Sequence, residues 1–253
     1  MKHKINSFFF LLIFIFEFYF LNDSEYFYSV LICTFLVLIL IIGCGVVFLK
    51  LRYFVPSINK LASDKVLLTF DDGPDSVITE KILEILEKNN IGALFFLIGE
   101  KVEQNRAIAD KIVKCGHLIG NHSYSHNNFM AFSSTKEIVK ECRKADIALN
   151  KVCKDRPSLF RPPIGYTTPN YTRAIERLKT RCIGWRLRSY DTIYKTSEKM
   201  VKRLVLKTRK GDIVLFHDTL KVTSDSLQTY ITEVQNNGII FVSKEEIKTL
   251  FDE

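Results

Sequence analysis

Two adjacent carboxylates are the first residues of the chain whose type and position suggest chemistry. Asp71 and Asp72 stand in the string TFDDGP, residues 69–74, directly after an apolar stretch. Like charges at the end of a strand repel each other unless a cation or a division of roles relieves them. An Asp-Gly-Pro sequence is also good turn sequence by itself, so the pair alone leaves a structural and a catalytic interpretation open.

Two histidines favour the catalytic interpretation. His122 and His126 stand in the string HSYSH, and their spacing predicts that both imidazoles lie on one face of a helical turn, where they can meet one ion. One carboxylate with two histidines leaves an open position for water, as in a catalytic zinc site. Such a metal lowers the pKa of bound water to about 7, and a free carboxylate beside it can take the proton. The sequence therefore predicts a hydrolytic site that holds zinc or another divalent transition metal.

Strands and helices alternate along the chain after the first 64 residues. The predicted strands are residues 65–70, 93–97, 117–121, 159–161, 181–185, 212–216 and 239–242. The predicted helices are residues 79–88, 102–115, 135–151, 170–179, 197–206 and 225–235, with a closing helix from Glu245. This alternation predicts an α/β fold with a distorted, incomplete β/α barrel of about seven parallel strands.

The carboxyl ends of these strands carry the polar candidates. Asp71 and Asp72 follow the first strand, and His122 follows the third. Arg161 ends the fourth strand and His217 follows the sixth. Because chemistry gathers at the carboxyl ends of parallel strands, we expect these side chains to converge on one face of the domain.

Two apolar runs precede the α/β region. Residues 30–49 carry no charge and number about 20, enough at about 1.5 Å per residue to cross a hydrocarbon layer of roughly 30 Å. Residues 8–21 form a shorter run that contains Glu17. We interpret the second run as a transmembrane helix. The first is either a second span, which the lack of a small-residue cleavage site favours, or the apolar part of a signal-type segment.

These features predict a three-part chain. Residues 1–50 form a membrane anchor of one or two transmembrane helices, residues 51–63 a juxtamembrane linker, and residues 64–253 the catalytic domain. The basic residues that flank the two runs are Lys2, Lys4, Lys50, Arg52 and Lys60, whereas the connector between the runs holds only acidic charges. Because basic residues tend to stay on the cytoplasmic side of a membrane, this distribution predicts an integral membrane protein whose catalytic domain lies in the cytoplasm.

The net charge of +8 suits a protein beside anionic lipid or a polyanionic polymer. Nucleic acid is not an expected partner, because the basic residues are dispersed and no recognition motif stands out. Membrane lipid is the expected partner, and no protein partner is evident from the sequence.

Five motifs together give the chain a family resemblance. They are TFDDGP at residues 69–74, HSYSH at 122–126, RPPIG at 161–165, the segment 185–191, and LFH at 215–217. In this order they resemble the polysaccharide deacetylase family, which is carbohydrate esterase family four and has a NodB-like homology domain. The resemblance covers residues 65–251, the whole region after the linker.

The resemblance implies a role for each matching residue. The implied ligands of a zinc ion, or of another divalent transition metal, are Asp72, His122 and His126. Asp71 is the implied general base and His217 the implied general acid. Arg161 would orient a catalytic carboxylate, and Asp191 would hold the His217 imidazole in its useful tautomer and charge state.

The resemblance also implies three substrate contacts. Leu215 would line the pocket for the acyl methyl group, and the backbone amide of Ile164 would stabilise the tetrahedral oxyanion. Loss of one such donor costs about 100- to 1000-fold in rate. Trp185 is either a platform for the sugar or a core residue.

Three positions depart from the family pattern. Ile164 stands where the family often has tyrosine, so a backbone role survives and a side-chain contact does not. Arg188 and Thr192 stand where the fourth motif commonly has aspartate and tryptophan, which changes the wall of the pocket. His117 matches no motif position, and we interpret it as structural.

The predicted function is metal-dependent hydrolysis of N-linked acetyl, or acyl, groups on the amino sugars of a polysaccharide or a lipid-linked glycan. An outward-facing domain would act on envelope polysaccharide such as peptidoglycan, and a cytoplasmic one on a lipid-linked sugar precursor. The alternative is a membrane protein of the same fold that binds metal or glycan without turnover.

Overall fold

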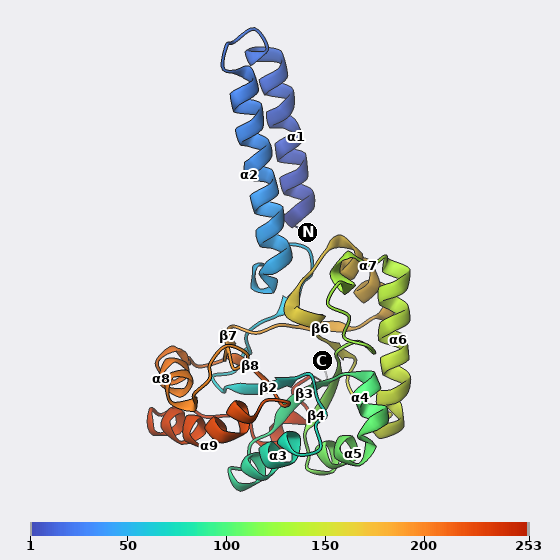
Figure 1. Cartoon of the computed structure of the whole chain (residues 1–253), viewed down its shortest axis with the longest axis vertical. Helices are drawn as coiled ribbons and strands as arrows, with labels where there is room; N and C mark the ends of the chain where they lie inside the picture. The colour runs from blue at the N-terminus through green and yellow to red at the C-terminus, as the bar shows by residue number, and fades with distance from the viewer. Residues whose placement is uncertain (1, 252–253) are drawn as a thin grey trace.

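The computed structural model describes residues 2–251, which form a helical hairpin joined to an α/β domain (Figure 1). Residue 1 of the predicted anchor and residues 252–253 of the predicted catalytic domain lie outside the described residues. The hairpin consists of α1 (Lys2–Leu21) and α2 (Phe27–Val47), both long and apolar enough to cross a membrane. Between them, the Thr34 hydroxyl donates a hydrogen bond to the buried carboxylate of Glu17.

The α/β domain is built on one eight-stranded sheet in which every pair of neighbours is parallel. The strands are β1 (Ser57–Ile58), β2 (Leu67–Asp71), β3 (Ala93–Leu97), β4 (Leu118–Asn121), β5 (Leu159–Phe160), β6 (Arg181–Ile183), β7 (Leu187–Arg188) and β8 (Ile213–His217). Their order is β1-β6-β5-β4-β3-β2-β8-β7. Since β1 and β7 are separate edges, the curled sheet is a half-barrel, and the predicted incomplete α/β barrel is confirmed.

Helices cover the outside of this sheet (Figure 1). They are α3 (Ile78–Lys88), α4 (Gly99–Gln104), α5 (Arg106–Lys114), α6 (Thr135–Val152), α7 (Pro169–Leu178), α8 (Ser197–Lys207), α9 (Lys221–Asn236) and α10 (Lys244–Ile247). Short 3-10 helices lie at Leu49–Leu51, Met130–Phe132 and Pro163–Gly165. The longest helix after the hairpin, α6, begins at a capping box in which Ser134 and Glu137 satisfy each other's backbone amides.

Strand alternation separates the apolar core from the polar interior of the half-barrel. On β2, the Phe70 ring stacks with the rings of Phe95 and Phe216, with centroids 4.9 and 5.9 Å apart, in the layer between the sheet and its helices. Because side chains alternate across a strand, Thr69 and Asp71 project to the opposite, inner face. The sequence of β2 therefore buries its aromatic residue and presents its polar residues to the site.

Two predicted elements differ from the structure. The helix predicted at 102–115 is two helices, because Asn105 has a non-helical backbone with φ −122° and ψ 47°. The strand predicted at 239–242 is wrong, since in this segment Phe241 forms an isolated bridge with Val66.

Two edge strands were not predicted. The segment predicted as linker, residues 51–63, contributes β1, where Ser57 pairs with Cys182 of β6. The other is β7, which pairs with β8. Each of these strands has two residues, too few to show an alternating pattern.

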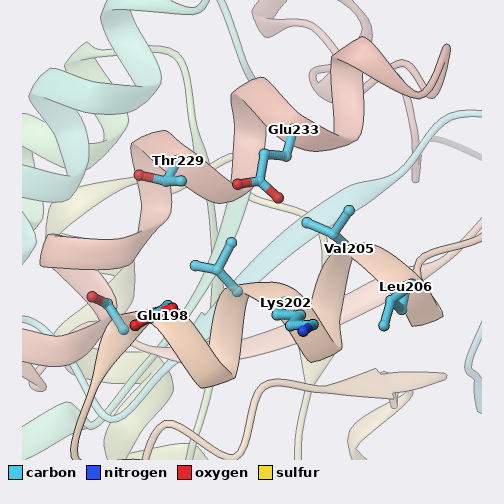
Figure 2. A pocket seen from close by; sticks show the side chains of 8 residues that line it. Glu198, Lys202, Val205, Leu206, Thr229 and Glu233 are labelled. Atoms are coloured by element: carbon cyan, nitrogen blue, oxygen red, sulfur yellow. The ribbon is translucent and has the colours of Figure 1, made fainter.

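A surface cleft of about 540 Å³ lies between α8 and α9 (Figure 2). Its wall combines apolar residues such as Val205 with charged residues such as Glu198, Lys202 and Glu233. The lining residues all come from these two helices, so this cleft is separate from the predicted site.

Candidate active site

A cavity of about 170 Å³ opens at the carboxyl ends of the strands. Its lining residues are Asp71, Asp72, His122, His126, Ile164, Trp185, Arg188, Thr192, Leu215 and His217. Eight of the ten residues predicted for the site line this cavity. The other two, Arg161 and Asp191, are buried behind it and form hydrogen bonds with lining residues. The structure thus brings together residues that are distant in the chain, of which Asp71 and His217, 146 positions apart, are the most widely separated.

Three of the lining residues form a cluster with metal-ligand chemistry. The ligand atoms of Asp72, His122 and His126 all lie within 4.8 Å of one another. Oδ1 of Asp72 is 3.4 Å from Nε2 of His122 and 3.2 Å from Nε2 of His126. This oxygen is buried and makes no hydrogen bond, the state of a group that lacks its natural partner. A divalent cation would satisfy it, and the three residues fit such an ion.

The orientation of His122 also suits a ligand. Its Nδ1 lies 2.8 Å from the backbone carbonyl oxygen of Arg161. Since a carbonyl can only accept, Nδ1 carries the hydrogen and donates it. When the ring is neutral, Nε2 therefore carries the lone pair and presents it to the cluster, as a second hydrogen-bond partner commonly arranges for a metal-bound histidine.

The histidine pair lies in a loop, so the predicted helical turn is wrong. Ser123 and His126 have left-handed backbones, with φ 65° and 51°. The side chain of Asn121 accepts a hydrogen bond from the Ser123 amide, and the Ser123 hydroxyl accepts one from the His126 amide. These side-chain bonds form a tight turn that brings the two imidazoles together without a helix.

Burial and charge shift the pKa values in this cluster. Burial alone would raise the pKa of Asp72, but His122 and then His126 lower it well below its ordinary value. Burial alone would lower the pKa of His122, and the charges of Asp71 and Asp72 raise it instead. The pKa of His126 is lowered by burial and by the neighbouring His122. The carboxylate of Asp72 is therefore charged across the physiological range.

Asp71 is held by a fully buried arginine. Nη1 of Arg161 donates to Oδ1 of Asp71 at 2.7 Å and to the Thr69 hydroxyl at 2.9 Å. The other guanidinium nitrogens donate to the carbonyls of Ile183 and Gly184, at 3.0 and 2.9 Å. A buried charge persists only when it is paired and hydrogen-bonded, and Arg161 meets both conditions. The carboxylate of Asp71 is consequently fixed in one orientation.

His217 and Asp191 form a second buried pair. Nδ1 of His217 lies 2.7 Å from Oδ1 of Asp191, whose Oδ2 accepts hydrogen bonds from the His217 amide and the Thr223 hydroxyl, both at 2.8 Å. Burial alone would lower the pKa of His217, but the hydrogen bond and charge of Asp191 raise it. The same contacts lower the pKa of Asp191, against the effect of its burial. The pair therefore favours a charged imidazole beside a charged carboxylate.

The remaining predicted contacts also line the cavity. Ile164 has a left-handed backbone, φ 60° and ψ −14°, which is strained for a β-branched residue. The Leu215 side chain is buried and Trp185 is half-buried. The Trp185 ring also lies 5.5 Å from the Arg161 guanidinium. Trp185 thus contacts both the core and the cavity, so the two interpretations of this residue are compatible.

One buried acid near the site was not predicted. Oδ2 of Asp218 accepts a hydrogen bond from the Thr79 hydroxyl at 2.7 Å, and its Oδ1 has no partner in the described chain. Burial and the negative charge of Asp72 raise its pKa to about 7. A Cβ on Gly73 would fall 2.1 Å from Oδ2, so only glycine fits there. The position of Asp218, directly after His217 at a strand end, is the signal that could have identified it.

Comparison with known proteins agrees with this architecture. A family model described as polysaccharide deacetylase matches residues 59–183. A peptidoglycan-N-acetylglucosamine deacetylase of Bacillus cereus is 30% identical over 198 residues, which cover 76% of this chain and 90% of the relative. The chain therefore belongs to the polysaccharide deacetylase family.

Two further relatives show how far the likeness extends. The peptidoglycan-N-acetylglucosamine deacetylase PgdA of Listeria monocytogenes is 31% identical over 194 residues, which cover 76% of this chain but only 41% of that relative. The chain thus spans about two fifths of the length of this relative. The crystal structure of BA3943, a CE4 family pseudoenzyme from Bacillus anthracis, matches with a TM-score of 0.69 and 27% identity, over 76% of this chain and 69% of that one.

Proposed function

We propose that this protein is a hydrolase that removes the N-linked acetyl group from an amino sugar of a peptidoglycan-type glycan or of the lipid-linked precursor of such a glycan. The names of the relatives from Bacillus cereus and Listeria monocytogenes support this substrate class. The observation that carries the proposal is the convergence of a metal-ligand cluster, a paired carboxylate and a paired imidazole on one cavity.

Asp72, His122 and His126 are the proposed ligands of a divalent metal, zinc or another transition metal. When bound, such an ion supplies a Lewis acid that polarises the amide carbonyl and acidifies water. The unpartnered, buried Oδ1 of Asp72 supports this assignment.

Asp71 and His217 divide the proton transfers in this proposal. Asp71 accepts the proton of the attacking water, and Arg161 keeps its carboxylate in place for this step. His217 then donates a proton to the leaving nitrogen. Because Nδ1 of His217 is engaged by Asp191, Nε2 is the nitrogen that remains for the substrate.

The other roles concern the acyl group and the sugar. We assign the backbone amide of Ile164 to stabilising the oxyanion and the side chain of Leu215 to packing against the acetyl methyl group. Trp185 lines the same cavity and provides an apolar surface for the sugar ring.

The two N-terminal helices are the proposed membrane anchor, in line with their length and composition. Most of their large apolar side chains are exposed, which suits contact with lipid. We further propose a cytoplasmic catalytic domain, because the basic residues adjoin its side of the hairpin.

The direct test is amine and acetate release from N-acetylglucosamine oligosaccharides and from peptidoglycan fragments, using the full chain loaded with zinc. Release from either substrate supports the proposal. Zinc binding without release from any acetylated glycan would favour the alternative, a non-catalytic binding protein. The presence of both Asp71 and His217 in the cavity is why we favour turnover.

A further inference from the structure

A second cavity, which we call the basic groove, adjoins the site cavity. Its volume is about 420 Å³, and it shares Ile164, Trp185 and Arg188 with the site cavity. A molecule whose reacting group lies near Asp71 can therefore extend into the basic groove across this common wall. The groove is large enough to hold one further polar group of a substrate.

The basic groove carries an excess of positive charge. Its basic residues are Lys50, Arg186, Arg188, Arg203 and Lys207, and among the described residues no Asp or Glu lines it. Arg186 forms an ion pair with the buried Asp212. Within residues 2–251, the other four have no acidic partner. The groove thus holds uncompensated cations around one concave space, which attracts an anion.

Arg188 gives the strongest indication of a missing anion. Its Nε is buried and has no hydrogen-bond partner in the described chain. The Arg203 guanidinium donates a hydrogen bond to the Arg188 backbone carbonyl at 2.8 Å, which ties the Arg203 side chain to the strand that carries Arg188. Buried polar nitrogens normally have a partner, and arginine forks match the oxygens of a phosphate group.

The groove also lies where the chain leaves the proposed membrane span. Val47, the last residue of α2, lines it together with Phe48, Leu49 and Lys50. Figure 1 shows this end of α2 meeting the α/β domain. With the hairpin in a bilayer, as proposed above, this positive charge would lie on the side of the domain that faces the lipid headgroups.

We propose that the basic groove binds the phosphate group of a substrate in which the N-acetylated sugar is linked through phosphate to a membrane lipid. This inference rests on the proposed function. The sugar occupies the site cavity, the phosphate lies against Arg188 and its basic neighbours, and the lipid chain follows the apolar surface of α2. The phosphate belongs to the substrate and not to bulk anionic lipid.

The test compares two substrates with the same reacting group, using the full chain in nanodiscs of phosphatidylcholine. One is N-acetylglucosamine linked by diphosphate to a polyisoprenyl chain, and the other is a neutral, soluble N-acetylglucosamine tetrasaccharide. The variant is Lys50→Gln with Lys207→Gln, because neither lysine lines the site cavity. Its control is Lys202→Gln, which removes one positive charge from α8 at a position that faces the cleft of Figure 2.

We expect the double variant to lower kcat/KM for the lipid diphosphate by about tenfold, which corresponds to about 1.4 kcal/mol for the two ionic contacts together. The neutral tetrasaccharide and the Lys202→Gln control should change by less than about twofold. A second measurement, independent of turnover, is calorimetric binding of N-acetylglucosamine 1-phosphate, which Arg188→Gln should weaken.

Other outcomes would overturn the inference. Equal losses on both substrates, or tetrasaccharide turnover with no preference for the diphosphate, would exclude the groove as a phosphate site and leave the proposed function standing. If the loss appears only in nanodiscs that contain phosphatidylglycerol, and on both substrates, the groove binds bulk lipid and the inference is wrong. If neither substrate releases amine, the proposed function itself is contradicted.

Discussion

Asp71 and His217 are register partners at the carboxyl ends of the adjoining parallel strands β2 and β8. Both line the site cavity, and each has a buried partner of the opposite charge. Arg161 donates to the Asp71 carboxylate, whereas Asp191 accepts from the His217 imidazole. The backbones of the proposed base and the proposed acid thus lie about one strand spacing apart, about 4.8 Å, an arrangement that suits two groups acting on one bond.

The first prediction concerns the base. Asp71→Asn should lower acetate release by at least about 100-fold, because an amide cannot accept the proton of the attacking water. Zinc content should stay at the level of the unchanged chain, since Asp71 is not among the three clustered ligands. Steady-state kinetics and metal analysis of the same preparation check both points. Retained turnover would remove Asp71 from the role of base.

The second prediction concerns the metal. Asp72→Ala should lose zinc, because it removes the oxygen that faces both His122 and His126. The matched control is Asp64→Ala, whose carboxylate is exposed in an ion pair with Lys210. Metal analysis after dialysis should give full occupancy for the control and little for Asp72→Ala. Equal occupancy in both would show that the ion binds elsewhere.

The third prediction concerns pH. Burial lowers the pKa of His217, but Asp191 raises it more, so the net shift is upward and the protonated acid persists to higher pH. The alkaline limb of the kcat/KM profile should therefore move to lower pH in Asp191→Asn, because this variant lacks the negative charge that raises the pKa of His217. Asp225→Asn, on an exposed ion pair with Lys221, should leave the limb in place. A limb that stays unchanged in Asp191→Asn would exclude His217 as its cause.

Much of this site could be predicted from the sequence, because alternation of strands and helices fixes where strands end. Asp71 and His217 follow apolar runs long enough to identify as strands, and the parallel sheet brings such ends together. The pairing of His122 with His126 was also predictable, but its cause was not. A four-residue spacing indicates a helix, whereas side-chain hydrogen bonds from Asn121 and Ser123 produce the same proximity in a loop.

Other features depend on contacts that a linear pattern does not contain. Asp218 gains its raised pKa from burial and from Asp72, which is distant in the chain. The edge strands β1 and β7 are defined by their partners and not by periodicity. The basic groove needs Lys50, the last residue of the predicted anchor, in one cavity with Arg188, and only the fold shows that both residues line it.

The fourth prediction tests the buried ion pair. Arg161→Met should destabilise the full chain by about 3–5 kcal/mol, because it leaves the Asp71 carboxylate buried without its partner. Adding Asp71→Asn to this variant should restore part of the loss, and the difference measures the coupling of the two groups. Lys210→Met, which breaks an exposed pair, should change stability little. Thermal unfolding in detergent micelles provides the comparison, and a fully additive double variant would mean that the pair is not coupled.

The fifth prediction places the domain relative to the membrane. Asn22 lies in the exposed connector of the hairpin, and Ser63 lies on the exposed surface beyond its other end. If the basic residues beside the helices mark the cytoplasmic side, Asn22→Cys should react with a membrane-impermeant maleimide in intact cells, and Ser63→Cys only after lysis. Labelling of the unchanged chain gives the background from its native cysteines, which is subtracted. The reverse pattern would place the site outside the cell, where a lipid-linked substrate would have to reach the basic groove from the opposite leaflet.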